Sequence, residues 1–235
     1  MKLPVPAGAL LVVTPALLLG APETTAPTPF QSGEVLHYDV VWPSGLTLGE
    51  GKFSAQAETG GWAFEVEIKA SLPNFEIQEQ HRARADGGLC SLELHKDAVR
   101  GQKKAKETVI FDQSAGRAKR ETYGGGGVSE FDIFPCARDG LTFLYFLRQD
   151  LARGRIPPPD DLNFGAQYAV TVTYAETRRI QAAGKSWEAD RILIDIAGPG
   201  SSHSFEVFFS KDAARKPLVV RVPFELGTFS LRLVE

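Results

Sequence analysis

The chain has 235 residues, 43% of them hydrophobic, which is long and apolar enough for one all-β domain with a sizeable core. Its formal net charge at pH 7 is −3 and its pI is near 5.9. This balance excludes an overall positive field that would attract nucleic acid or anionic lipid, and we expect no nucleic-acid partner. Two short basic runs, at residues 103–106 and 117–120, are typical of solvated faces.

The N-terminus has the pattern of a secretory signal. Lys2 is the only charged residue among residues 1–21, and the apolar run over 10–19 suits a signal peptide but is too short to span a bilayer. We predict a signal peptide at 1–21, a Pro/Thr-rich linker at 22–29, and a periplasmic or otherwise extracytoplasmic protein. Ala21 precedes a proline and gives no clean cleavage site, so an uncleaved anchor is the alternative. Membrane association is expected only through that segment.

Residues 30–235 read as a single β-rich domain. Apolar and polar residues alternate over residues 62–72, which predicts a strand with one dry and one wet face. Shorter runs with the same period recur at residues 36–42, 168–174, 192–196, 205–209, 218–222 and 229–233. Turn residues separate these runs, as in a sandwich or barrel, and half-wet strands are mostly antiparallel.

Residues 75–86 depart from this alternation. After Ile77 the segment is polar on both faces, which favours a solvated edge strand or a long hairpin arm, because charges on an edge discourage pairing with other chains. The alternative is that the segment lines a polar groove.

One helix is predicted, near residues 139–152. Asp139 is a good N-cap, and the residues that follow are apolar on nearly all sides, so the helix must be buried. Arg148 reads as a charge near the helix end. The predicted fold is therefore all-β with one buried helix. A single curled antiparallel sheet, open or spiral and β-barrel-like, wraps around this central helix.

Cys90 and Cys136 are the only two cysteines. Because export permits disulfides, we expect them to bridge and to pin the helix to the sheet, at a gain of about 4 kcal/mol in the chain-entropy model. Two buried free thiols are the alternative. No Cys/His spacing fits a metal site, and the sequence predicts neither a metal nor another cofactor.

The helical segment resembles the central signature of a bacterial family, domain of unknown function 3108. The matching residues are Cys136, Asp139, Leu141, Thr142, Leu144, Tyr145, Leu147 and Arg148. An opening segment also matches, with Gly33, Glu34, Tyr38, Val40 and Gly49, as does a closing segment with Phe209, Ser210, Asp212 and Pro217. The resemblance covers roughly residues 30–235. It implies an exported protein whose motif residues are structural, setting the helix start and its packing, and it implies no particular activity.

No catalytic site is predicted. A serine nucleophile usually sits in G-x-S-x-G, and the nearest segment, residues 200–203, lacks the second glycine. A helix cap and a helix-end charge explain Asp139 and Arg148. We therefore expect a non-catalytic envelope protein acting as an interaction or scaffold module with an envelope protein partner. The alternative is a carrier of a lipid or other apolar small molecule, held in a groove between the helix and the sheet. A hydrolase is the least favoured reading.

Overall fold

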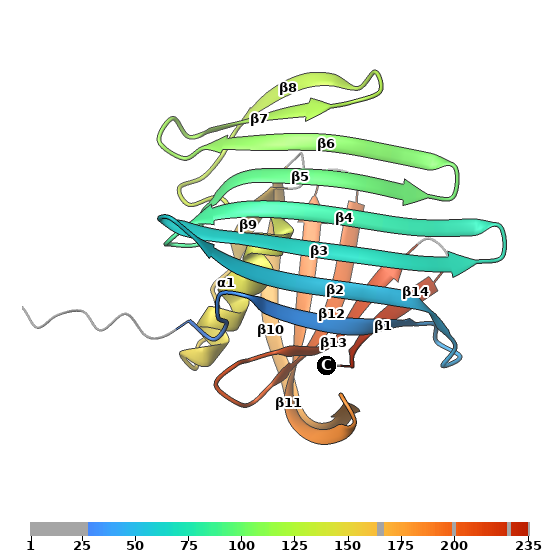
Figure 1. Cartoon of the computed structure of the whole chain (residues 1–235). Helices are drawn as coiled ribbons and strands as arrows, with labels where there is room; N and C mark the ends of the chain where they lie inside the picture. Colours follow the sequence, from blue (N-terminus) through green and yellow to red (C-terminus); the bar gives the residue numbers. More distant parts are fainter. Residues whose placement is uncertain (1–27, 164–166, 199–200, 225–226, 235) are drawn as a thin grey trace, which may run out of the picture.

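The computed structural model describes residues 28–163, 167–198, 201–224 and 227–234, which form one antiparallel sheet of fourteen strands and one helix (Figure 1). The predicted signal peptide and the linker up to residue 27 lie outside the described residues. Within the described ranges, the structure has no helix with the length and apolar character needed to cross a membrane.

Eight strands precede the helix and six follow it. The first group comprises β1 (Glu34–Val41), β2 (Thr47–Glu58), β3 (Gly61–Leu72), β4 (Phe75–Asp86), β5 (Ser91–Arg100), β6 (Lys103–Asp112), β7 (Arg117–Thr122) and β8 (Gly127–Asp132). The helix is α1 (Gly140–Ala152). The second group comprises β9 (Asp160–Asn163), β10 (Gln167–Ala182), β11 (Lys185–Gly198), β12 (Ser201–Ser210), β13 (Pro217–Phe224) and β14 (Gly227–Leu233).

The strand order shows how the two groups become one sheet. It runs from β8 down to β1, then passes to β14 and continues down to β9. The first and last strands join the halves, in a register that pairs Tyr38 with Leu233 and Val41 with Ser230. The sheet stays open, with β8 and β9 at its edges. The predicted class, a single curled antiparallel sheet with one helix, is confirmed.

The two halves cross each other rather than lying flat. In Figure 1 strands β1–β8 run horizontally, β10–β14 run steeply behind them, and α1 stands at one side of the space between. The hydrophobic core lies between the two halves of the sheet. Phe143, Leu147 and Leu151 of the helix pack into an apolar cluster that contains residues of both halves. Leu141 and Tyr145 pack instead into a second cluster built mainly from the first half. The helix is therefore buried on two sides, as its composition predicted.

The prediction of an edge strand at residues 75–86 is wrong. This segment is β4, which pairs along its length with β3 and β5, so it is a hairpin arm and not an edge of the sheet. Its inner face carries Ile77, Glu79, Ala83 and Ala85, all buried. The alternation was hidden because a charged residue and two small alanines stand where large apolar residues were expected.

Candidate functional site

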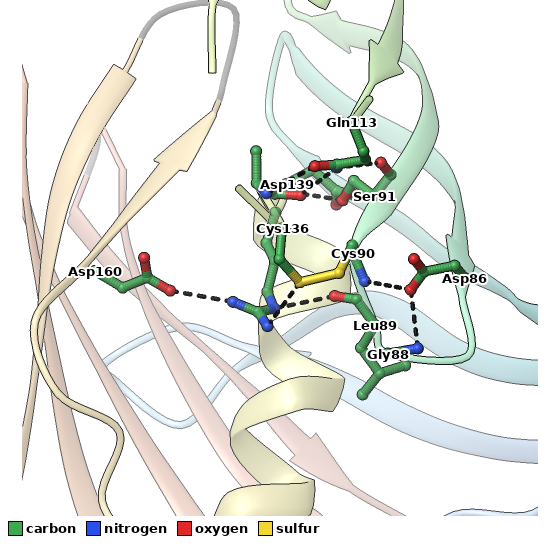
Figure 2. The surroundings of a disulfide bond; sticks show 11 residues. Asp86, Gly88, Leu89, Cys90, Ser91, Gln113, Cys136, Asp139 and Asp160 are labelled. Carbon is green, nitrogen blue, oxygen red and sulfur yellow. Dashed lines mark hydrogen bonds and ion pairs between the residues drawn. A yellow bond between two sulfur atoms is a disulfide. The ribbon is translucent and has the colours of Figure 1, made fainter. Parts of the chain in front are cut away.

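The start of α1 is fixed by a buried carboxylate (Figure 2). Asp139 is fully buried and accepts hydrogen bonds from the backbone N–H groups of Leu141 at 2.8 Å and Thr142 at 3.0 Å. The hydroxyls of Thr142, at 2.7 Å, and Ser91, at 2.6 Å, donate to its other oxygen. Asp139 is therefore the N-cap of α1, as predicted, and its hydrogen bond with Ser91 also connects the helix to β5.

A disulfide reinforces this junction. Cys90, just before β5, is bonded to Cys136, just before the helix, with their Cα atoms 4.6 Å apart (Figure 2). Beside it, the Gln113 side chain donates to the Ser91 carbonyl at 2.7 Å and to the Ala137 carbonyl at 3.0 Å. The predicted bridge thus lies where it can pin the helix start to the sheet.

The junction also reaches the second half of the sheet. The Arg138 guanidinium donates to the Leu89 carbonyl at 3.0 Å, forms an ion pair with Asp160 at 3.1 Å, and lies 3.8 Å from the ring centroid of Phe146. Asp160 begins β9, so this one side chain links the β4–β5 turn, the helix and the opposite edge of the sheet.

The interpretation of Arg148 as a helix-end charge is wrong. The residue is 1% exposed, and its guanidinium forms a bidentate ion pair with Glu34 at 2.6 and 2.9 Å. It also donates to the carbonyl of Ala214 at 3.0 Å. The helix continues for another turn beyond Arg148, so this side chain faces the interior and not a solvated helix end.

The three segments that carry the family resemblance meet around Arg148. Glu34 belongs to the opening segment, and Ala214 lies within the closing segment, between Asp212 and Pro217. The opening segment also contacts the closing segment directly, because the Tyr38 hydroxyl donates to the carbonyl of Pro217, the first residue of β13, at 2.7 Å. Sequence reasoning missed the pair of Glu34 and Arg148. The only available signal was that both stand in matched segments.

The remaining motif residues divide between the core and a groove. Leu147 is fully buried, and Tyr145 stacks on Phe64 with ring centroids 3.9 Å apart. Burial raises the pKa of Tyr145 above its ordinary value. Leu141 and Leu144 line an apolar groove between the helix and the sheet.

This apolar groove has a volume of about 250 Å³ and lies between α1 and both halves of the sheet. Of the described side chains that line it, only His81 is polar. The lining residues are Phe53, Val66, Ile68, His81, Gly140, Leu141, Phe143, Leu144, Leu162, Ile194, Ile196, Phe205, Val207, Val220, Val222 and Leu231. Such a lining suits an apolar ligand and offers no ligand set for a metal.

A second cavity of about 180 Å³ continues the groove along the sheet. The two share a wall made by Val66, Ile68, His81, Val222 and Leu231. Several apolar lining side chains are only partly buried, which leaves the groove accessible from solvent. These are Val66, Ile68, Leu144, Phe205 and Val222.

Three polar side chains, Glu79, His81 and Arg100, also line the second cavity. Glu79 is 9% exposed; its carboxylate lies 3.1 Å from Nε2 of His81 and accepts a hydrogen bond from Nε of Arg100. Burial alone would raise the pKa of Glu79, but the hydrogen bonds to His81 and Arg100 outweigh it and lower the pKa below its usual value. Glu79 is thus an ionised carboxylate with a hydrogen-bond partner on each oxygen.

Comparison with known proteins places the chain in a family. No curated protein matches it. Among solved structures, a candidate lipoprotein from Parabacteroides distasonis ATCC 8503 aligns over 87% of this chain and 95% of its own, with 8% identity and a TM-score of 0.34. A family model described as "Protein of unknown function (DUF3108)" matches residues 37–234. The chain therefore belongs to the DUF3108 family.

Proposed function

We propose that the protein is an exported, non-catalytic envelope protein that holds the apolar chain of a lipophilic ligand in the groove between α1 and the curled sheet. The observation that carries this proposal is the apolar groove itself, at about 250 Å³ with a continuation of about 180 Å³. Together the two cavities reach the lower end of the range of small-molecule sites, about 300–1,000 Å³. The helix fills the interior only in part.

The energetics favour an alkyl chain as the occupant. Each CH₂ group moved from water into an apolar groove contributes about 0.8 kcal/mol. The groove is also preformed, since the cap of Asp139, the disulfide and the Arg138 contacts hold the helix against the sheet. A rigid site loses little conformational freedom on binding, so more of the burial energy appears as affinity.

The disulfide between Cys90 and Cys136 supports an extracytoplasmic location, because reducing compartments rarely keep such bonds. The predicted signal peptide fits the same location. An interaction or scaffold role, which the sequence favoured first, stays a prediction. We place ligand binding ahead of that role because the apolar groove between α1 and the sheet is not filled by side chains.

The proposal can be tested by filling the groove. Ile68 lines both cavities, and its neighbour Lys69 is exposed on the other face of β3. We expect Ile68→Trp to abolish binding of the apolar probe N-phenylnaphthylamine, measured by fluorescence, while Lys69→Trp binds it like the wild type. Native mass spectrometry of protein expressed in an oxidising periplasm should show a bound lipid that Ile68→Trp lacks. A folded Ile68→Trp variant with unchanged probe binding would disprove the site.

A further inference from the structure

His81 is the polar side chain that the groove and its continuation have in common. It stands on β4 opposite Val66 of β3, and it lines both cavities. Its side chain is 29% exposed, so the ring is packed only in part. The other described side chains of the first cavity are apolar, whereas Glu79 and Arg100 line the second cavity. His81 therefore lies where the apolar site becomes polar.

The neighbour of His81 decides which of its ring nitrogens carries a hydrogen. Nε2 lies 3.1 Å from a carboxylate oxygen of Glu79. Because Glu79 is ionised, its oxygens can only accept, and Nε2 must donate. In the neutral ring the other nitrogen, Nδ1, then has a lone pair and accepts. Nδ1 makes no hydrogen bond to any of the described residues. The site therefore presents an acceptor without a donor.

The charged groups around His81 already have partners. One oxygen of Glu79 is paired with His81 and the other accepts from Arg100. Lys96, the register partner of His81 on β5, pairs with Glu107 at 3.5 Å. An anionic head group would meet both the carboxylate of Glu79 and the lone pair of Nδ1, and a cationic head group would find both oxygens of Glu79 occupied. A neutral hydrogen-bond donor is the group that complements this set.

Resting on the proposed function, we infer that the ligand is a single-chain amphiphile whose head carries a neutral hydrogen-bond donor, a hydroxyl or an amide N–H, which binds Nδ1 of His81. The alkyl chain lies in the first cavity, and the head lies at His81, where the second cavity begins. A ligand without a donor would cover Nδ1, which would lose its contact with water and gain no partner. A site built to hydrogen-bond a group discriminates against analogues that lack it.

The test uses two matched pairs of ligands as competitors of N-phenylnaphthylamine, at a pH of about 8.5, above the range in which histidine ordinarily changes charge. Decanol is compared with decyl methyl ether, and N-methyldecanamide with N,N-dimethyldecanamide. Within each pair only the first ligand has a hydrogen to donate. The ratio of the two affinities does not depend on how tightly the probe itself binds. The pair with the larger effect distinguishes a hydroxyl head from an amide head.

Two histidine variants assign the preference to His81. His81→Phe removes the acceptor and keeps an aromatic ring. His95→Phe makes the same change on the other face of the sheet, on β5, where the side chain is 50% exposed. In at least one pair, the affinity of the donor relative to its partner should fall by about three- to tenfold in His81→Phe, as expected for the loss of one hydrogen bond. The ratio should be unchanged in His95→Phe.

Nitrogen-15 NMR of histidine-labelled wild-type protein gives a second reading that needs no variant. The tighter-binding donor should move the resonance of one unprotonated ring nitrogen upfield, as accepting a hydrogen bond does, and its partner without a donor should not. Equal ratios in the wild type and His81→Phe for both pairs, or the absence of this shift, would overturn the inference and leave the proposed function standing. Failure of all four ligands to displace the probe would overturn both.

Discussion

At the scale of single residues, the buried ion pair of Arg148 and Glu34 matters most. Its bidentate geometry and its third contact, to the Ala214 carbonyl, compensate a guanidinium that is 1% exposed. Removing one member of such a pair leaves an uncompensated buried charge, which costs far more than the pair itself contributes.

We expect Glu34→Gln to lower the free energy of unfolding by about 3–5 kcal/mol, because it leaves the Arg148 charge buried without a counterion. Urea unfolding monitored by fluorescence measures this change. Glu58→Gln is the control, since Glu58 pairs with Arg84 at the surface and its loss should cost less than about 1 kcal/mol. Equal effects of the two substitutions would contradict the account of Arg148.

Glu79 gives a prediction for acid stability. Its pKa is lowered in the folded protein, so the unfolded chain binds more protons at acid pH and stability rises with pH. The contribution of Glu79 is present above the ordinary glutamate pKa of about 4.3 and is lost as pH falls through the lowered value. Across this window, unfolding free energies from urea titrations should fall more steeply for the wild type than for Glu79→Gln. Parallel curves would show that Glu79 gains nothing from His81 and Arg100.

At the scale of elements, the local sequence pattern predicted those strands and helices whose formation depends on neighbouring residues in the chain. Alternation located β3 to within a residue, and Asp139 with the apolar run after it located α1. The pattern failed at β4, where Glu79 stands on the inner face because Arg100, 21 residues later, satisfies its charge. The interpretation of Arg148 as a helix-end charge was wrong for the same reason, since its partner Glu34 is 114 residues away in the chain. Long-range charge pairing leaves no trace in local periodicity.

The helix start gives the prediction at this scale. Reduction of the disulfide between Cys90 and Cys136 should lower the free energy of unfolding by about 4 kcal/mol, because the unfolded chain regains the freedom of a long closed loop. Chemical unfolding with and without dithiothreitol measures the difference. The Cys90→Ser/Cys136→Ser double variant should match the reduced wild type and ignore the reductant. An unchanged unfolding midpoint on reduction would show that hydrogen bonds around Asp139 hold the helix alone.

At the scale of the whole molecule, the groove is a consequence of how the two halves cross. Strands β1 and β14 join them along one short pairing, and α1 then packs at one side, so the space between the halves is filled unevenly. No local pattern reports the volume left over. The sequence could therefore propose a groove between helix and sheet but could not decide whether side chains fill it.

Two substitutions on β13 test whether this space is open. Val222 lines both cavities and is partly exposed, whereas Leu218 is 0% exposed in the packed core. Leu218→Phe should lower the free energy of unfolding by about 1–3 kcal/mol, because a packed site cannot take a larger side chain without strain. Val222→Phe should leave stability unchanged or raise it by up to about 2 kcal/mol, because the ring enters empty space and buries apolar surface. Thermal and urea unfolding give both values. If Val222→Phe destabilises the protein as much as Leu218→Phe does, then the two halves are already packed together there, and no ligand chain can lie between them.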